Sequence, residues 1–463
     1  MPDAKEKSKD NDETLSRRDF LKVSGVLAGG LVAATYLGKI GFDVFREIES
    51  NPLEAPKEDK YVTSVCLQCP AGCAILVRVT DGRAVKIEGN PSSPNNLGKI
   101  CPKGQIGLQI LYDPDRIKKP LKRAGERGEN KWVEISWDTA LNEIAQKLKE
   151  IRERNEPHTL VFMSGRNRGQ IGSFIDRFLS AYGSPNHVGH GSICSDGSKQ
   201  GHYLTVGVKS YMGYDWDNTN YILCFGGGFI EAWRPTTRLL RAYGHLHRGK
   251  PIRGKLVQIE PRFSVTAAKA DEWLPINPGT DGALALAIAH VIVKEKLYNK
   301  SYLISHTDAP HLIDINTHEP LKSDDGKKFY VVDETTGAPA LWDPETHAYE
   351  PLTTQPALFP AGGDIFNVEI QGKTYQAKTV LQLWKEEVLD EMTPEKAEEI
   401  TGIEKETIER IAREFATTPP QIAAGERGAS MQPYGALTRQ AIHVLNALVG
   451  SIGVPGGVIN QID

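Results

Sequence analysis

Cysteine is scarce in this 463-residue sequence, and the six cysteines are unevenly placed, with four of them between residues 66 and 101. They are too few and too clustered for a disulfide scaffold, so they indicate a metal site and separate thiols. An excess of basic charge is also missing, and the formal net charge of −4 argues against a broad electrostatic affinity for nucleic acid. The composition is ordinary for a globular protein, and the length allows several domains.

The N-terminus lacks a long hydrophobic run. The mildly apolar stretch from Val23 to Leu37 is short beside the roughly 20 residues that a membrane-spanning helix needs. It follows Arg17 and Arg18, and paired arginines before a short apolar stretch are typical of a twin-arginine export signal. We therefore predict such a signal over residues 1–40. An ordinary membrane anchor is the alternative, and the absence of a clear Ala-x-Ala cleavage site would also allow the segment to stay as a tether.

Short apolar runs followed by helical periodicity recur along the chain, which predicts α/β domains with parallel sheets. The predicted strands are Leu160–Met163, Tyr221–Phe225 and Leu256–Ile259. The predicted helices are 137–154, with Ser136 as its cap, 171–182, one beginning near Pro235, 282–296, 394–402, 404–417 and 436–450. Residues 305–378 are rich in Asp, Thr, Pro and Gly, which favours an insertion built from hairpins.

The cysteine cluster carries the strongest chemical signal. Cys66, Cys69, Cys73 and Cys101 follow the spacing C-x2-C-x3-C-x27-C, in which three close thiolates and a distant fourth can converge on one 4Fe-4S cluster. Zinc is an alternative, although zinc sites generally pair two short ligand units. Disulfides are another, although bridges between such close cysteines would be strained. Asp81-Gly82, between two strand-like runs of the same region, predicts a β-hairpin.

The block from Cys66 to Gly104, which ends in Cys-Pro-Lys-Gly, resembles the N-terminal domain of the dimethyl sulfoxide reductase family of molybdopterin enzymes. Further segments that resemble this family are Asn220–Gly228, Glu260–Arg262, Asp271–Trp273, Pro278–Asp281 and Leu445–Gly457. The resemblance covers essentially everything after residue 59. It implies an α/β fold class, with a small N-terminal 4Fe-4S domain with β hairpins followed by Rossmann-like dinucleotide-binding domains. The family's C-terminal domain is expected to be absent from this chain.

The resemblance also implies a bis-molybdopterin guanine dinucleotide cofactor that holds molybdenum or tungsten. A cation such as Lys103, between the cluster and the pterin, can stabilise an electron on the cluster, although an exposed surface lysine is the alternative. A glycine run after an apolar strand lets backbone N–H groups approach a pyrophosphate, although such a run can also form only a tight turn. The implied cofactor-binding residues are Lys103, Gly226, Gly227, Gly228, Glu260, Gly279, Thr280 and Asp281.

Cys194 stands where the family supplies a protein ligand to the metal. A soft thiolate suits molybdenum that is already bound by dithiolene sulfurs. A buried cysteine that acts as a small hydrophobe is the alternative, and Cys224 fits it because it lies within a predicted strand. Arg166, His190, Lys199 and Tyr211 resemble in placement the donors of respiratory arsenate reductases, and cations near a metal ligand suit an anionic substrate.

The predicted domain organisation follows from these signals. It consists of the export signal at 1–40, a linker at 41–59, a 4Fe-4S domain at 60–120, an α/β domain with the metal-ligand loop at 121–215, a dinucleotide-binding α/β domain at 216–300, an insertion at 301–380 and a helical and α/β return segment at 381–463.

The resemblance implies the catalytic subunit, or its N-terminal part, of an exported anaerobic respiratory oxidoreductase. The expected substrates are inorganic sulfur compounds or oxyanions of the polysulfide, thiosulfate, tetrathionate or arsenate type. The expected partners are an iron–sulfur electron-transfer subunit, a quinone-linked membrane subunit, a second chain that would supply the C-terminal domain, and the twin-arginine export machinery. The expected location is the periplasm or the outer face of the cytoplasmic membrane. The alternative is a non-catalytic scaffold or electron-transfer subunit of a membrane quinone oxidoreductase complex.

Overall fold

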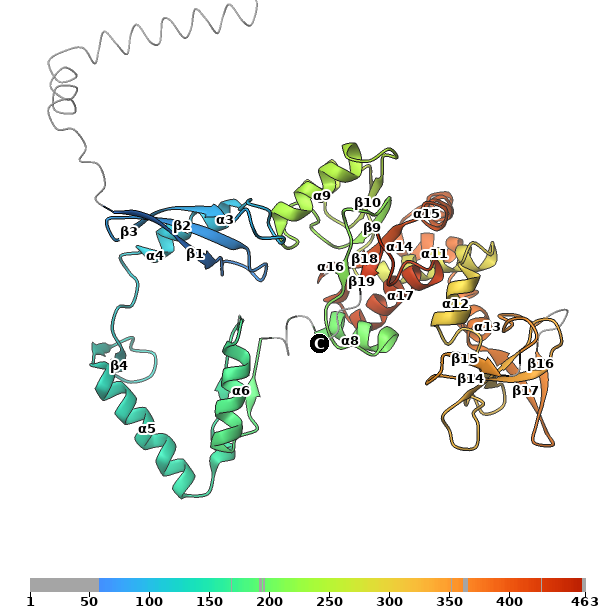
Figure 1. Cartoon of the computed structure of the whole chain (residues 1–463), viewed down its shortest axis with the longest axis horizontal. Coiled ribbons are helices and arrows are strands. Elements are labelled where there is room, and N and C mark those ends of the chain that lie inside the picture. Colours follow the sequence, from blue (N-terminus) through green and yellow to red (C-terminus); the bar gives the residue numbers. More distant parts are fainter. Residues whose placement is uncertain are drawn as a thin grey trace, which may run out of the picture. The chain divides into compact units, whose positions relative to one another are not determined.

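The computed structural model describes residues 58–167, 169–190, 194, 196–350, 352–360, 365–425 and 427–459 (Figure 1). The predicted export signal, and all but the last two residues of the predicted linker, lie outside these ranges. Among the described residues, no helix combines the length and the apolar character that crossing a bilayer requires.

The cysteine-rich region contains a three-stranded sheet of order β1-β2-β3, formed by Asp59–Val65, Ala74–Thr80 and Arg83–Gly89. Asp81 and Gly82 both have positive φ, at 48° and 78°, as a two-residue hairpin turn of type I′ requires. The predicted hairpin is therefore confirmed. Two short helices follow, α3 (Pro102–Gln105) and α4 (Gly107–Leu111).

The next segment alternates strands and helices. β4 (Leu121–Arg123) pairs antiparallel with β5 (Trp132–Glu134), and β6 (Phe162–Met163) pairs parallel with β7 (His187–Val188). Helix α5 (Trp137–Glu153) begins after Ser136, whose side chain accepts from the Thr139 N–H, which confirms the predicted cap. Helix α6 (Ile171–Tyr182) ends at Gly183, which has a φ of 101°. The strand predicted at Leu160–Met163 is shorter than expected, because only Phe162 and Met163 pair with β7.

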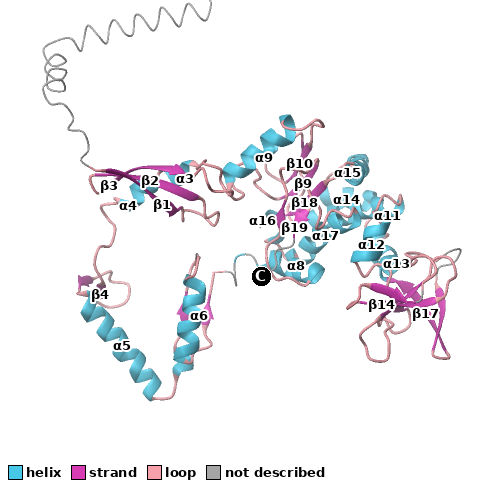
Figure 2. Cartoon of the chain, viewed as in Figure 1, coloured by secondary structure: helices cyan, strands magenta, loops and turns pink. Residues whose placement is uncertain are grey.

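A four-stranded parallel sheet lies at the centre of the larger core (Figure 2). Its order is β11 (Glu272–Leu274), β10 (Lys255–Ile259), β9 (Tyr221–Phe225) and β18 (Gln421–Gly425). All five residues of β9 are buried, as expected for a strand covered on both faces. The parallel pairing confirms the predicted α/β class.

Helices cover both faces of this sheet because side chains along a strand point alternately to either side. Tyr221, Leu223 and Phe225 join a core with α11 (Asp281–Lys294), α14 (Pro394–Thr401), α15 (Lys405–Thr417) and α17 (Gly435–Leu448). Ile222 and Cys224 face a second core, formed with α9 (Thr236–Arg248). The helix predicted at 282–296 ends at Lys294, and Lys296 already has a φ of 56°.

The predicted insertion folds into two antiparallel three-stranded sheets. One has the order β12-β17-β16, formed by Leu312–Asp314, Lys373–Thr379 and Phe366–Ile370. The other is β13-β14-β15, formed by Phe329–Val332, Pro339–Asp343 and Ala348–Glu350. Helix α12 (Lys300–His306) precedes them, and α13 (Val380–Trp384) with a π-helical turn at Lys385–Leu389 follows. The antiparallel pairs confirm the hairpins expected in this segment.

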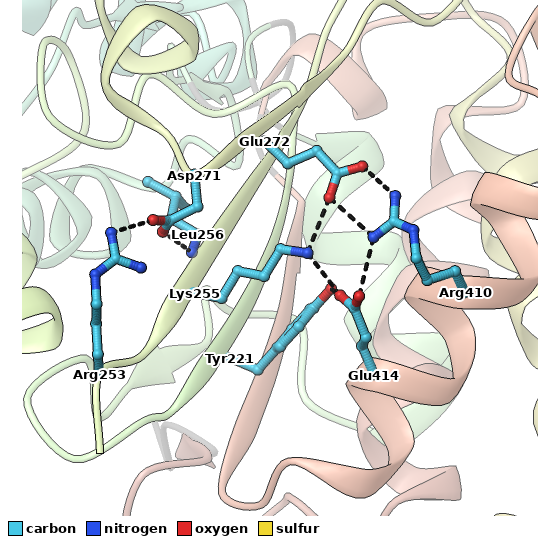
Figure 3. Close-up of polar contacts among 8 residues, drawn as sticks. All are labelled: Tyr221, Arg253, Lys255, Leu256, Asp271, Glu272, Arg410 and Glu414. Carbon is cyan, nitrogen blue, oxygen red and sulfur yellow. Dashed lines mark hydrogen bonds and ion pairs between the residues drawn. The ribbon is translucent and has the colours of Figure 1, made fainter. Parts of the chain in front are cut away.

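A polar network joins helix α15 to the amino-terminal edge of the central sheet (Figure 3). Arg410 of the helix donates to Glu272 at 3.1 Å and to Glu414 at 3.0 Å. Lys255 lies 2.9 Å from Glu272 and 2.6 Å from Glu414, which also accepts from the Tyr221 hydroxyl at 2.8 Å. Burial alone would raise the pKa of Glu272, but the hydrogen bonds from Arg410 and Lys255 outweigh it and lower that pKa. The network therefore stabilises the folded state when its carboxylates are ionised.

We expect Glu272→Gln to lower the free energy of unfolding by about 1–3 kcal/mol at pH 7, because charge-assisted bonds contribute on that scale. A carboxyl with a lowered pKa in the folded state adds stability above its unfolded pKa and loses it as the pH falls through the folded pKa. The difference between the variant and the wild type should therefore shrink below about pH 4.3, the ordinary glutamate value. Urea denaturation across this pH range measures it.

Arg253→Ala is the matched control. The Arg253 side chain is 62% exposed and contacts Asp271 beside the same sheet, so its loss should cost less than about 1 kcal/mol. Equal losses in the two variants, or a Glu272→Gln difference that does not change with pH, would contradict the assignment.

Candidate active site

The four clustered cysteines come together around one short loop. Cys66 follows strand β1, Cys69 and Cys73 lie between β1 and β2, and Cys101 immediately precedes helix α3. The Cys66 N–H donates to the Cys73 carbonyl at 2.8 Å, which closes the loop on itself. All four side chains are half-buried and none forms a disulfide.

The electrostatics of this loop fit a metal cluster. Burial raises the pKa of the Cys73 thiol to about 11, and the charges of Cys69, Cys66 and Cys101 add to the increase. Four sulfurs that repel one another as thiolates need a positive centre between them, and an iron–sulfur cluster supplies one.

Lys103 lies in the first turn of α3, two residues after Cys101, and its side chain is exposed. Gly104 follows it and is buried, and a side chain there would come within 3.4 Å of the Cys66 sulfur. An exposed side chain is compatible with the predicted role of Lys103 and with an ordinary surface lysine. Its contact with a pterin stays a prediction.

The glycines predicted to bind the pyrophosphate follow the carboxyl end of β9. Gly226 has a φ of 60°, and a Cβ there would lie 2.7 Å from the Gly428 backbone, which follows the neighbouring strand β18. Two backbones can pass so closely only because both residues are glycine. The Gly227 carbonyl accepts from the Gln258 side chain at 2.9 Å, and the Gly228 carbonyl accepts from the Trp233 N–H at 2.8 Å. The next helix, α9, begins at Thr236, close to the predicted start.

Two buried carboxyl groups lie at the same edge of the sheet. Glu260 directly follows β10 and accepts from the Ser264 hydroxyl, while burial raises its pKa. Asp281 is the first residue of α11, is 5% exposed, and has a pKa raised to about 6 by burial. Gly279, with a φ of 81°, and Thr280 form the turn before it. The carboxyl ends of parallel strands form the usual ligand-binding edge of open α/β sheets, so these groups are suitably placed for a nucleoside.

Cys194 lies two residues before the start of helix α8 (Asp196–Val206). Helix α8 packs against α17. Two guanidinium groups converge on its sulfur. The Arg166 Nη2 lies 4.0 Å away, and the Arg427 Nη2 contacts the sulfur directly. The hydroxyls of Ser198 and Ser430 are 2.6 Å apart and tie α8 to α16 (Arg427–Ser430). The thiol is therefore held among cations, unlike Cys224, which is fully buried in β9 as predicted for a packing residue.

The other predicted donors are His190, Lys199 and Tyr211. His190 lies four residues before Cys194, and its Nε2 is buried without a hydrogen-bond partner. Such an orphaned nitrogen fits a site that a further group completes. Lys199, on α8, lies 5.4 Å from the centre of the Tyr211 ring, and Tyr211 is 40% exposed. The structure thus brings Arg166 and Cys194 together and pairs Lys199 with Tyr211.

Arg427 was not predicted from the sequence. It comes two residues after Gly425, the last residue of β18, and this strand was not predicted either. A cation just past the carboxyl end of a buried strand would have been the signal, because it lies at the ligand-binding edge of a parallel sheet.

Comparisons with known proteins agree with this geometry. Residues 59–113 match the family described as molybdopterin oxidoreductase Fe4S4 domain, and residues 116–463 match the molybdopterin oxidoreductase family. The arsenate respiratory reductase molybdopterin-containing subunit of Shewanella sp. (strain ANA-3) is 32% identical over 97% of this chain and 47% of its own length. The menaquinone reductase molybdopterin-binding-like subunit of Nitratidesulfovibrio vulgaris is 32% identical over 60% of this chain and 40% of its own.

A solved structure gives the same result for the fold. Acetylene hydratase from Pelobacter acetylenicus matches with a TM-score of 0.58 and 25% identity, over 86% of this chain and 44% of that one. The chain spans about half the length of the curated relatives that it matches. The expected 4Fe-4S domain and molybdopterin fold are therefore confirmed.

Proposed function

The chain belongs to the dimethyl sulfoxide reductase family of molybdopterin oxidoreductases, and we propose that it is the N-terminal part of a catalytic subunit that reduces an inorganic oxyanion or sulfur compound. The observation that carries this proposal is the position of Cys194 beneath the guanidinium groups of Arg166 and Arg427. A non-catalytic fold has no need to hold a thiol and two cations together.

Each residue of the site has a definite task in this proposal. Cys194 supplies a thiolate ligand, and the molybdopterin cofactor, when bound, supplies a metal that exchanges two electrons with the substrate. The backbone at Gly226, with Glu260 and Asp281, would hold the guanine dinucleotide part of the predicted cofactor. Cys66, Cys69, Cys73 and Cys101 would hold the 4Fe-4S cluster, with Lys103 beside the fourth cysteine.

Arg166 and Arg427 bind and orient the substrate. Guanidinium groups match the oxygens of tetrahedral oxyanions through paired N–H donors, and they stay charged at any physiological pH. His190 offers a further nitrogen for hydrogen bonding. We place arsenate first among the candidates because a relative matched over nearly the whole chain is an arsenate respiratory reductase subunit. Polysulfide, thiosulfate and tetrathionate are the other candidates.

Replacing Arg427 by alanine should raise the KM for arsenate several-fold to about a hundredfold, the equivalent of about 1.5–3 kcal/mol for a charge-assisted contact. Arg427→Lys keeps the charge but not the paired donors, so it should recover only part of the loss. Steady-state kinetics of the complete enzyme with each candidate substrate measure this effect. Unchanged kinetics in Arg427→Ala for every substrate would remove Arg427 from the site.

The second candidate is a non-catalytic scaffold subunit of a quinone-linked membrane complex. The similarity to the menaquinone reductase molybdopterin-binding-like subunit favours it. The two arginines at Cys194 favour the enzyme instead, since cations beside a metal ligand suit an anionic substrate. We also propose that the subunit works with an iron–sulfur electron-transfer subunit and a quinone-linked membrane subunit.

We further propose that the protein is exported by the twin-arginine route to the periplasm or to the outer face of the cytoplasmic membrane. The paired Arg17 and Arg18 are read by a receptor, not by bulk charge, so replacing both with lysine should leave the protein in the cytoplasm. Fractionation of cells that express the wild type and the double variant measures this, with Lys5→Arg and Lys7→Arg as the charge-conserving control. Normal export of the double variant would contradict the proposal.

A further inference from the structure

A chain of hydrogen bonds connects helix α6 to the loop that carries Arg166. The His187 Nδ1 lies 2.9 Å from the Asp176 carboxylate, and its Nε2 lies 3.0 Å from the Ser164 hydroxyl. The Asn167 side-chain amide donates to the same hydroxyl at 3.1 Å. Ser164 and Asn167 stand on either side of Arg166 in the sequence, so these hydrogen bonds tie together both sides of the arginine.

The donors and acceptors of this chain all point in one direction. An ionised carboxylate only accepts, so a neutral His187 carries its proton on Nδ1 and donates to Asp176. Its Nε2 then accepts from the Ser164 hydroxyl, whose oxygen accepts in turn from Asn167. Each hydrogen bond is made only when the neighbouring group is in place, so the loss of one group weakens the others.

His187 is fixed by the strands from which the two site loops emerge. It is the first residue of β7 and the register partner of Phe162 in β6. The two rings pack edge to face, with 5.9 Å between their centres and 88° between their planes. The loop after β6 carries Arg166, and the chain after β7 leads to Cys194. His187 therefore links the two segments whose side chains meet at the candidate metal ligand.

Serine, histidine and aspartate in this order also form the triad of many hydrolases, but the contacts of Ser164 do not suit that chemistry. Its hydroxyl already accepts from the Asn167 amide, and its N–H donates to the Val188 carbonyl at 3.0 Å. The N–H of the serine is therefore not available for the oxyanion hole that such a hydrolase needs.

We propose that Ser164 and His187 are positioning residues for Arg166. Anchored by Asp176, they hold the guanidinium at Cys194, where it receives the oxyanion substrate. Residues 164–167 belong to no helix or strand, so the regular hydrogen bonds of secondary structure do not fix this loop. A small displacement of a substrate-binding group costs affinity, and the hydrogen-bonded chain prevents it. The inference rests on the proposed substrate role of Arg166.

The experiment uses the complete enzyme with its cofactors and partner subunits, and arsenate and thiosulfate as the probes. Ser164→Ala should raise the KM and the calorimetric Kd for the bound anion by about three- to tenfold, the scale of one lost hydrogen bond. The kcat, the metal content and the 4Fe-4S signal should stay at wild-type values, because only uniform substrate binding is lost. Ser164→Thr, which keeps the hydroxyl, should restore most of the affinity. Asp176→Ala should weaken binding by a smaller factor.

A double-mutant cycle separates positioning from a general structural effect. If Ser164 acts through Arg166, Ser164→Ala should have no further effect in an Arg166→Ala background. Ser180→Ala, at an exposed serine of α6, is the matched control and should behave like the wild type.

The variants also distinguish the failure of this inference from the failure of the proposed function. Wild-type KM and Kd in Ser164→Ala, or losses that add in the double variant, would overturn the inference while Arg166→Ala still weakens anion binding. Wild-type values in Arg166→Ala itself would overturn the proposed substrate role of Arg166 and the inference with it. A lower kcat and metal content in Ser164→Ala, with an unchanged KM, would also contradict positioning.

Discussion

Replacing Cys194 with alanine should reduce turnover by more than about a hundredfold, beyond what the loss of an outer-shell partner costs at a metal site. In the proposed site the thiolate would act on the metal directly, whereas the arginines would act on the substrate. The 4Fe-4S signal of the variant should be intact, because the cluster cysteines belong to another part of the chain. Turnover, metal content and the electron paramagnetic resonance spectrum of the complete enzyme measure the three effects.

Cys224→Ala is the matched control for this experiment. Cys224 is fully buried in β9, and its sulfur contacts the Gly227 carbonyl at 3.3 Å. Its loss should lower stability modestly and leave the chemistry in place. If Cys194→Ala keeps both its molybdenum or tungsten and its activity, Cys194 is not a ligand.

Replacing Cys69 with alanine should abolish the cluster. A 4Fe-4S centre with this cysteine spacing is held by four protein thiolates. Without one of them, the iron content should fall from about four per chain towards zero. Turnover that depends on an external electron donor should fall with it. Gln68→Ala changes an exposed neighbour in the same loop and should preserve the iron. Four irons per chain in Cys69→Ala would rule out the ligand set.

Local patterns in the sequence were sufficient to predict most of the helices and strands. Ser136 and the apolar stripe after it predicted α5 to within one residue, and Asp81-Gly82 predicted the hairpin turn. Tyr221–Phe225 was predicted as a strand with its observed bounds. The signals were a cap, a turn and a continuous apolar run. Each of them lies within about a dozen neighbouring residues.

Strand β18 was missed for a physical reason. Its sequence, Gln-Ile-Ala-Ala-Gly, has a single β-branched residue, and alanine and glycine are poor strand formers. It is a strand because it pairs in parallel with β9, about 200 residues earlier. Such long-range pairing leaves no trace in local periodicity. Arg427 was missed with it, since its importance follows from where the strand ends.

The same difference between local and long-range signals holds for the candidate site. Ligand spacing predicted the chemistry of the four cysteines, and their convergence needs only one loop and one nearby helix. The meeting of Arg166, Cys194 and Arg427 joins positions that are 28 and 233 residues apart in sequence.

The most direct test is metal analysis of the complete protein, purified without oxygen together with its partner subunits. A molybdopterin reductase with one cluster should contain about four irons and one molybdenum or tungsten per chain, and arsenate or a sulfur substrate should reoxidise its reduced cluster. About four irons, but neither molybdenum nor tungsten, and no reoxidation by any candidate substrate would contradict the catalytic role and leave a scaffold subunit in its place.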